Sequence, residues 1–285
     1  MRDVTGQRQL YPDVVLAHEP PTVVLVANTF EGPDIAAKIN SAVAALPPSG
    51  GTILISPGTY TFATMISLAD KNVHLTGSGE GFDNSPPLPP PELPPPAGTR
   101  LIWAGATGET AIQVTNTGKN QPAVTTRLSN FSLDNSTDHV AGVGIDIDGI
   151  NHAFIEHVTI NPKKALGFST GIRVGRMAQT VDVTLRDVLV ANNDIGLLAE
   201  NVSAGILLDH ARFEKSTHEN VKVMGAGAGS PVLSFHAYGS AFDATSTTAS
   251  SVPVTNPPGA SVRVTYNGTP DPSSRYLMQI LCMGI

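Results

Sequence analysis

The motif Leu128-x-x-Phe131-x-Leu133 decides the fold, because near-copies of it recur along residues 127–242. The copies are Ile155-x-x-Val158-x-Ile160, Leu185-x-x-Val188-x-Val190, Leu208-x-x-Ala211-x-Phe213 and a looser one that begins at Phe235. A second motif alternates with the first: Gly144-Ile145-Asp146-Ile147, Gly171-Ile172-Arg173-Val174, Gly196-Leu197-Leu198-Ala199 and Asn220-Val221-Lys222-Val223. Successive copies lie roughly 23 to 30 residues apart, which is typical of stacked supersecondary units.

These motifs predict short β-strands, because they are too short for helices and they alternate apolar with polar residues. The x-x step in the first motif breaks the alternation, which predicts a tight bend between two strands. Each unit then contains three strands, one from the Gly-Ile-x-Ile motif and two that flank the bend. Stacked units pair each strand with its copies above and below and join the apolar positions into one core. The periodicity therefore predicts an all-β parallel β-helix, a solenoid fold.

Composition agrees with this prediction and excludes several functions. The 285 residues are 41% hydrophobic but only 5% aromatic, so the core is aliphatic; 27 Gly, 23 Pro and 14% charged residues suit many turns and little helix. The net charge of −7, without a basic stripe, argues against a nucleic-acid partner. An acidic polymer can still bind a local basic patch, so total charge does not exclude an anionic polysaccharide.

Neither disulfides nor a bound metal is expected to stabilise the chain. Cys282 is the one cysteine, and no Cys/His cluster has the spacing of zinc ligands. We expect no cofactor. No apolar run reaches 18 residues, so no membrane span is predicted. The first residues lack an apolar signal segment, so the protein is either cytoplasmic or secreted with its signal already removed. We favour an extracellular location.

The chain divides into three predicted regions. Residues 1–30 form an extended arm, residues 31–245 the parallel β-helix, and residues 246–285 two C-terminal cover strands. Within the middle region, residues 34–46 predict a helix with Asp34 as N-cap, which would cover the apolar end of the solenoid. Residues 84–98 are a proline-rich insertion of polyproline II character, either a binding arm or, as we favour, a tolerated excursion.

A family resemblance supports the same architecture. Asp34-x-x-x-x-Ile39-x-x-x-Val43, followed by Gly50-Gly51-Thr52-Ile53-x-Ile55-x-Pro57-Gly58-Thr59-Tyr60, resembles the capping helix and first coil of the pectate-lyase-superfamily, or polygalacturonase-like, right-handed parallel β-helix proteins. The likeness covers about residues 30 to 240. Family members include polysaccharide lyases, inverting glycoside hydrolases, epimerases and tail-spike depolymerases. The resemblance implies that the Gly-Ile-x-Ile strands form the floor of a sugar-binding groove.

Strand alternation places a candidate catalytic set on that floor. With Ile145 and Ile147 inward, Asp146 and Asp148 point outward, and Arg173 lies one coil away. The two carboxylates are about 6.5 to 7 Å apart at their α-carbons. Such a pair can perform acid/base hydrolysis, and Arg173 can depress one carboxyl pKa or hold a substrate carboxylate. Ordinary cross-strand ion pairs remain the alternative interpretation. His152, in the turn after Asp148, is a further acid/base candidate.

Candidate substrate-binding residues lie on the same outward row and on the loops that precede its strands. They are Gln113, His139, Lys163, Lys164, Glu200 and Lys222. Lys163 and Lys164 would contact an anionic sugar, although a solvated pair is the simpler explanation. By the family likeness, the residues at the bend are structural turn residues: Asn130, His157, Asp187 and His210.

Two functional hypotheses remain. The first is a secreted polysaccharide-degrading enzyme, either a glycoside hydrolase or a lyase; in a lyase, Arg173 or Lys222 would be the base. The second is a non-catalytic glycan-binding or tail-spike-type module, with a homotrimer as the candidate assembly. The polygalacturonase Asn-Thr-Asp, Asp-Asp, Gly-His-Gly and Arg-Ile-Lys set and a calcium-binding Asp cluster are absent from the sequence, which favours the second. The Asp146, Asp148 and Arg173 set favours the first.

Overall fold

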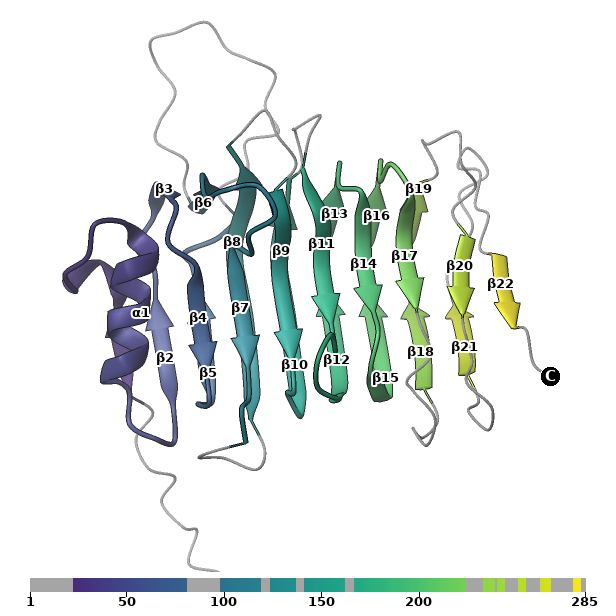
Figure 1. The fold of residues 1–285 in the computed structure, drawn as a ribbon, viewed down its shortest axis with the longest axis horizontal. Helices are drawn as coiled ribbons and strands as arrows, with labels where there is room; N and C mark the ends of the chain where they lie inside the picture. The colour runs from purple at the N-terminus through teal and green to yellow at the C-terminus, as the bar shows by residue number, and fades with distance from the viewer. Residues whose placement is uncertain are drawn as a thin grey trace, which may run out of the picture.

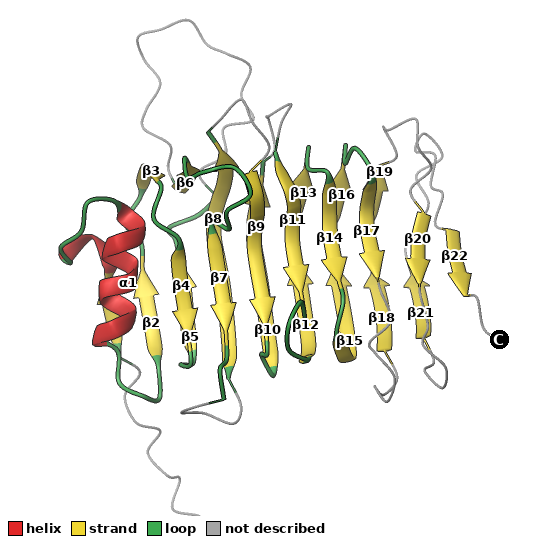
Figure 2. Cartoon of the chain, in the orientation of Figure 1, coloured by secondary structure: helices red, strands yellow, loops and turns green. Residues whose placement is uncertain are grey.

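The computed structural model describes residues 23–80, 98–118, 124–136, 141–161, 167–223, 233–238, 240–243, 251–254, 262–267 and 279–282. These residues are mostly β-strands, and every strand pairing among them is parallel. A 14-stranded sheet and a six-stranded sheet contain all but two of the strands (Figures 1 and 2). The mostly parallel-β prediction is therefore confirmed.

The six-stranded sheet is built from the Gly-Ile-x-Ile motifs. Its strands are β4 (Ile66–Ala69), β7 (Ile112–Thr115), β9 (Ala141–Asp148), β11 (Phe168–Val174), β14 (Ile195–Ala199) and β17 (Glu219–Val223). Residues at equivalent motif positions are register partners; Ile145 pairs with Ile172, and Ile172 pairs with Leu197. The predicted alignment of the repeats is thus observed strand by strand.

The 14-stranded sheet contains the other strands of each repeat. Its long path is β1 (Val24–Val26), β2 (Gly51–Leu54), β5 (Val73–Thr76), β8 (Thr125–Asn135), β10 (His152–Ile160), β12 (Thr180–Arg186), β15 (Val202–Asp209), β18 (Leu233–Tyr238) and β21 (Val262–Asn267). Beyond the bend lie β3 (Gly58–Phe62), β6 (Thr99–Trp103), β13 (Leu189–Ala191), β16 (Arg212–Glu214) and β19 (Ala241–Asp243). Strands β20 (Ser251–Val254) and β22 (Gln279–Cys282) pair with each other.

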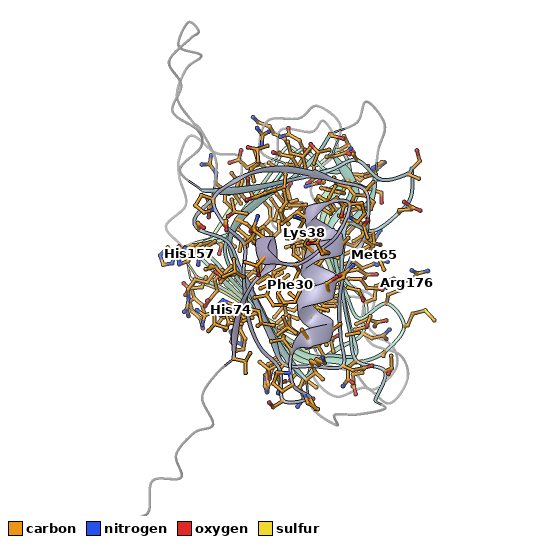
Figure 3. All side chains as sticks on the ribbon, turned by 90° about the vertical axis from the view of Figure 1, so that its left-hand side faces the viewer. Phe30, Lys38, Met65, His74, His157 and Arg176 are labelled. Atoms are coloured by element: carbon orange, nitrogen blue, oxygen red, sulfur yellow. The ribbon has the colours of Figure 1, made fainter. Side chains whose placement is uncertain are left out.

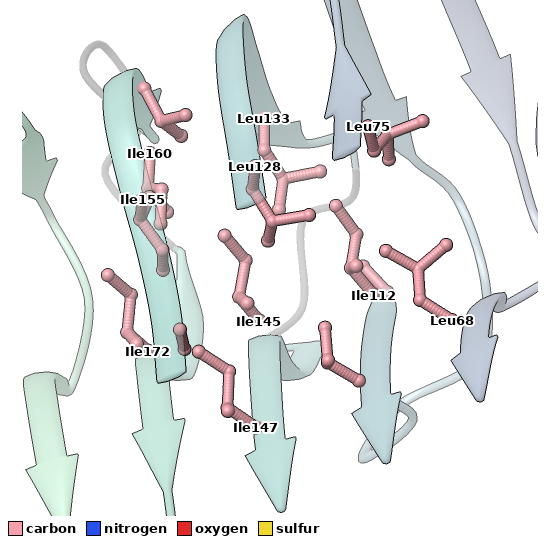
Figure 4. Close-up of a cluster of buried hydrophobic side chains, with 14 of the residues drawn as sticks. Leu68, Leu75, Ile112, Leu128, Leu133, Ile145, Ile147, Ile155, Ile160 and Ile172 are labelled. Carbon is pink, nitrogen blue, oxygen red and sulfur yellow. The ribbon is translucent and has the colours of Figure 1, made fainter. Parts of the chain in front are cut away.

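The apolar positions of both motifs meet in one largely aliphatic core between the sheets, which also contains aromatic residues such as Phe131 and Phe213 (Figure 4). Ile145 and Ile147 of β9 are buried together with Ile155 and Ile160 of β10. Burying one such side chain contributes about 1.5 to 3 kcal/mol. Each repeat buries its apolar residues only against its neighbours, so the recurrence of the pattern is itself what stabilises the stack.

The glycine that opens three of the four copies of the second motif is required by close approach of the rungs. A Cβ atom on Gly144 would lie 2.6 Å from the Gly171 carbonyl oxygen. A Cβ on Gly171 would lie 2.8 Å from the carbonyl oxygen of Gly196. Any larger side chain would push neighbouring rungs apart, which explains why the motif begins with glycine.

The predicted bend is a single residue in the left-handed conformation. Asn130, His157, Asp187 and His210 have φ of 60°, 51°, 50° and 52°. Non-glycine residues rarely adopt this conformation, and Asn and Asp tolerate it best. The positions predicted to be turn residues are therefore confirmed as the corner of each repeat.

The predicted cap helix is α1 (Ile35–Ala45), which covers the N-terminal end of the stack (Figure 1). Asp34 is its N-cap, with one carboxylate oxygen accepting from the Ala37 amide at 2.8 Å. The other oxygen accepts from the amides of Ala63 and Thr64, both at 3.0 Å. Burial raises the pKa of Asp34, but these three hydrogen bonds outweigh it and lower the pKa overall. The cap thus ties the helix to the first coil.

Segments near both ends of the chain pair with the 14-stranded sheet, which the sequence does not predict. Strand β1, inside the predicted arm, pairs in parallel with β2. Strand β21, predicted as a cover, pairs with β18 and adds another rung. Residues 84–97 of the proline-rich insertion lie outside the described residues, and the proposed domain boundaries stay predictions. None of the helices that the structure describes has the length and hydropathy needed to cross a bilayer.

Candidate active site

The outward side chains of the six-stranded sheet, with those directly following its strands, form the surface that we call the six-stranded face. Register aligns one row across it: Ser67, Gln113, Asp146, Arg173, Leu198 and Lys222. A second row runs beside the first: Thr115 pairs with Asp148, and the backbone hydrogen bonds of Gly175 to Ile147 and of Glu200 to Val174 continue the row to Gly175 and Glu200. The rows predicted from alternation are therefore present, and the polar residues of neighbouring repeats do line up.

Asp146 and Arg173 form a buried, two-pronged ion pair at the centre of this face. Arg173 Nε donates to Asp146 Oδ1 at 2.9 Å, and Nη2 donates to Oδ2 at 2.6 Å. The side chains are only 4% and 16% exposed. The hydrogen bonds to Asp146 raise the pKa of Arg173 against the opposing effect of burial. Both Asp146 oxygens are engaged by a permanently charged guanidinium, so this pair is a fixed element of the site.

Asp148 is held by the backbone of the next turn. Its Oδ1 accepts from the Met177 amide at 3.0 Å and from the Ala178 amide at 2.8 Å, and its Oδ2 lies 3.1 Å from the Met177 amide. These contacts fix the orientation of a partly exposed carboxylate at the end of β9.

Glu200, which directly follows β14, has the perturbed carboxyl group of this face. Burial raises its pKa; Arg173 and Arg176 oppose the shift, whereas the negative charges of Asp146 and Asp148 reinforce it. Its Oε2 atom is buried and has no hydrogen-bond partner among the described residues. A carboxyl group whose pKa is raised by burial is a candidate general acid.

A residue without a side chain, Gly175, lies between Asp148 and Glu200 in the register of the repeats. Gly175 occupies the rung between them, because its amide bonds to the Ile147 carbonyl at 2.8 Å and the Glu200 amide bonds to the Val174 carbonyl at 2.9 Å. Two rungs correspond to about 9 to 10 Å between the α-carbons. Gly175 has φ of 74°, and a Cβ there would lie 2.7 Å from Asn201 backbone atoms. The Asn201 backbone therefore occupies the place that a side chain would need, and only glycine fits this position.

Sequence reasoning placed Glu200 on the face but treated it only as a binding residue. Its partnership with Asp148 across Gly175 was missed, although the alignment of the repeats already placed a glycine between the two carboxylates. The missing information was burial, since the raised pKa arises from desolvation that residue spacing does not report.

The remaining candidates are distributed unevenly. Gln113 is the register partner of Asp146, and Lys222 lies 3.3 Å from Glu219 in an ion pair. His152 begins β10 in the other sheet, where its Nδ1 lies 3.3 Å from Asp182, so it is not brought to the six-stranded face. His139, Lys163 and Lys164 lie outside the described residues.

A histidine–aspartate contact lies where strands of the six-stranded sheet begin, whereas Asp148 and Glu200 lie where strands of that sheet end. His218 Nδ1 and the Thr217 hydroxyl both contact Asp194, just before β17 and β14 begin. The hydrogen bond to Asp194 raises the pKa of His218. Among the residues that the structure describes, no group of three or more His, Cys, Asp or Glu is arranged to hold a metal ion.

Comparison with known proteins leaves the family open. No protein-family model and no curated protein sequence matches this chain. Solved structures of DFA-IIIase from Arthrobacter chlorophenolicus A6 are similar at 14% identity: the form without its lid has a TM-score of 0.46 and covers 86% of this chain and 89% of that one. The complex with GF2 has a TM-score of 0.41, at 88% and 86% coverage. Likeness at this level carries no argument about function.

Proposed function

We propose that this chain is a secreted polysaccharide-degrading enzyme, a glycoside hydrolase built on a right-handed parallel β-helix. The architecture is supported by the parallel pairing of each strand with the equivalent strand of the next repeat. Right-handed connection is the general rule for parallel strands. The sequence resemblance to the pectate-lyase superfamily supports the same choice.

The raised pKa of Glu200, opposite Asp148 across Gly175, carries the proposal. Protonated Glu200 donates its proton to the glycosidic oxygen as the bond between that oxygen and the anomeric carbon breaks. The Asp148 carboxylate accepts a proton from a water molecule, whose oxygen forms the new bond to the anomeric carbon. Carboxyl groups about 6.5 to 9.5 Å apart leave room for that water. Proton exchange with solvent then restores both groups.

The Asp146–Arg173 ion pair supports this chemistry because it holds two charged groups in fixed positions near Asp148 and Glu200. Its geometry also favours hydrolysis over elimination. A lyase needs a base, but hydrogen bonding to Asp146 raises the pKa of Arg173 and makes proton abstraction by it harder. The other candidate base, Lys222, is in an ion pair with Glu219.

A non-catalytic glycan-binding module is the second candidate. Its supporting observation is that Asp146 and Asp148 both have structural partners, in Arg173 and in the turn at Met177 and Ala178. Under this proposal the six-stranded face binds a glycan without cleaving it, in a homotrimer as the candidate assembly. Turnover separates the two candidates.

The test is a panel of neutral and anionic polysaccharides, assayed both for new reducing ends and for the ultraviolet absorbance of unsaturated products. We expect reducing ends alone. Glu200→Gln should lower kcat by about 10² to 10⁴-fold, the usual contribution of a general acid. Glu31→Gln, an exposed glutamate beside α1, is the matched control and should retain activity. Unsaturated products, or an active Glu200→Gln variant, would contradict the mechanism; binding without turnover would favour the module.

The pH profile gives a second readout. Because the pKa of Glu200 is raised, its proton is retained above the pH at which an ordinary glutamate ionises. The rate should therefore fall only as pH rises through that raised pKa. Glu200→Gln should remove this alkaline limb from whatever residual rate remains. An unchanged limb in the variant would assign the titration to another group.

A further inference from the structure

Histidines gather on the side of the molecule away from the candidate active site. Five of the eight histidines in the chain lie on the outward surface of the path β5–β8–β10–β12–β15–β18 or at the corner that borders it: His74, His152, His157, His210 and His236. We call this surface the histidine face. Viewed along the stack, His74 and His157 lie on one side of the molecule, and Met65 and Arg176 lie on the other (Figure 3).

A chain of ion pairs runs across the rungs of the histidine face. Arg127 contacts Glu156, whose other oxygen lies 3.5 Å from Arg186 Nη1. Arg186 Nε in turn lies 2.8 Å from Asp209 Oδ2, and Asp209 Oδ1 lies 2.9 Å from His210 Nδ1. The arginines and His210 are about half exposed or more. When His210 is protonated, this series of ion pairs contains three cations and two carboxylates, so its net charge is +1.

The other four histidines fall into two kinds. His152 and His157 each face one carboxylate, Asp182 at 3.3 Å and Asp187 at 3.8 Å, and both are about half exposed. His74 and His236 have no carboxylate partner among the described residues. His74 Nε2 lies 2.8 Å from the Ser129 hydroxyl, and the ring of His236 lies parallel to that of Tyr238 at 6.1 Å.

The sign of the charge on this face depends on the imidazoles. Two arginines and four carboxylates give −2 when all five histidines are neutral, and +3 when all five are protonated. Histidine ordinarily makes this change between about pH 5 and 8. The six-stranded face has no such reversal, because its charged groups are Asp, Glu, Arg and Lys: Asp146, Asp148, Glu200, Glu219, Arg173, Arg176 and Lys222.

We infer that the histidine face is a second binding surface, separate from the candidate active site, that holds an anionic polysaccharide chain under mildly acidic conditions. Its cationic groups recur on successive rungs about 4.8 Å apart along a sheet, so they meet a linear polyanion at several points. Tyr238, 37% exposed, is its one exposed large apolar residue among the described residues and offers a ring on which a sugar can pack. A lipid surface would need more apolar contact.

The histidines do not all become charged together. Burial lowers the pKa of His74, and the positive charge of Arg127 lowers it further, although Glu156 opposes the shift. His74 therefore gains its proton at lower pH than an ordinary histidine. Binding should accordingly strengthen over a broad range as pH falls, with the last contribution from His74.

Polygalacturonate is the probe, with dextran as the neutral control, and binding is measured in the Glu200→Gln background so that cleavage does not interfere. We expect binding to polygalacturonate at pH 5, at least tenfold weaker binding at pH 7.5, and loss in 0.5 M salt because exposed charges are screened. His157→Asn/His210→Asn should weaken binding at pH 5 by about tenfold. Asn fits these left-handed corners, as Asn130 shows, so the fold is preserved.

The matched control is His218→Asn, at the edge of the other sheet, which should bind as the parent does. Equal binding at both pH values, or no binding at pH 5, would overturn the inference. Normal binding by the His157→Asn/His210→Asn variant would also overturn it. Weaker binding by Arg176→Ala would overturn it as well, because Arg176 lies on the side of the molecule away from His74 and His157. Binding to anionic phospholipid vesicles without binding to polygalacturonate would also overturn it. Because cleavage plays no part in this readout, its failure is independent of the proposed hydrolase activity.

Discussion

The six-stranded face and the histidine face use the same kinds of residue in different environments. On the six-stranded face, Asp146 and Arg173 are nearly excluded from solvent and fill each other's hydrogen-bonding capacity. On the histidine face, Arg186 is 47% exposed and divides its contacts between Glu156 and Asp209. The difference teaches that burial raises the pKa of a carboxyl group on one face, at Glu200, whereas hydrogen bonding to Arg186 lowers the pKa of Asp209 on the other. The exposed face keeps groups that solvent and protons can still reach.

Removal of one arginine from each face gives the largest expected contrast. Arg173→Met leaves Asp146 buried without its partner, which should cost about 3 to 5 kcal/mol of unfolding free energy. Arg186→Met removes a half-exposed arginine and should change stability far less. Urea denaturation of both variants measures the difference.

The double variant Asp146→Leu/Arg173→Met is the control for this contrast. It should recover most of the stability lost in Arg173→Met, because no unpaired charge remains buried. If Arg173→Met and Arg186→Met lower the free energy of unfolding equally, the burial of the Asp146–Arg173 pair does not make it more important for stability than the exposed pair.

A strand glycine of the six-stranded sheet and a corner residue of the histidine face give a smaller contrast. Gly171→Ala should cost about 1 to 3 kcal/mol, because its new Cβ would lie 2.7 Å from the Val190 side chain and 2.8 Å from the Gly196 carbonyl oxygen. His157→Asn should change stability by about 0.5 kcal/mol or less, since its corner is limited by φ and not by space. Thermal unfolding at pH 7.5 compares them. A tolerated Gly171→Ala would show that the rungs can separate without loss.

The pH dependence of the histidine face should give the smallest effect. Since the folded-state pKa of His74 is lowered, the unfolded chain binds a proton more readily, and stability is lost as pH falls through the ordinary histidine range. His74→Gln should remove this loss, which is within about 0.5 kcal/mol because the group is partly exposed. Tm at pH 8 and pH 5 for both proteins provides the measurement. An equal acid-side decrease in both would assign the loss elsewhere.

Much of the fold could be predicted because its signals are local and repeated. The apolar alternation around Ile145 and Ile172, the bend at Asn130 and the N-cap at Asp34 each depend on a few adjacent residues. The outcomes at the chain ends depend on distant pairing instead. Strand β21 reads as an isolated strand in the sequence, and only its alignment with β18 shows that it extends the sheet.

The sequence predicted which face several charged residues share, but not how they interact. Alternation and repeat length placed Asp146, Asp148, Arg173 and Glu200 on one face. They could not show that Arg173 donates hydrogen bonds to both oxygens of Asp146. They also could not show that His152 begins a strand of the 14-stranded sheet. Those outcomes depend on side-chain direction and on where each strand ends.

The sequence alone determined that this chain stacks parallel strands around an aliphatic core, because a period of apolar residues fixes which side chains turn inward. The tertiary structure alone decided which of the outward carboxyl groups has a raised pKa. A pKa depends on solvent exclusion and on the distances to charges that lie a whole repeat or more away in the sequence, as the opposing effects of Arg173 and Asp148 on Glu200 show.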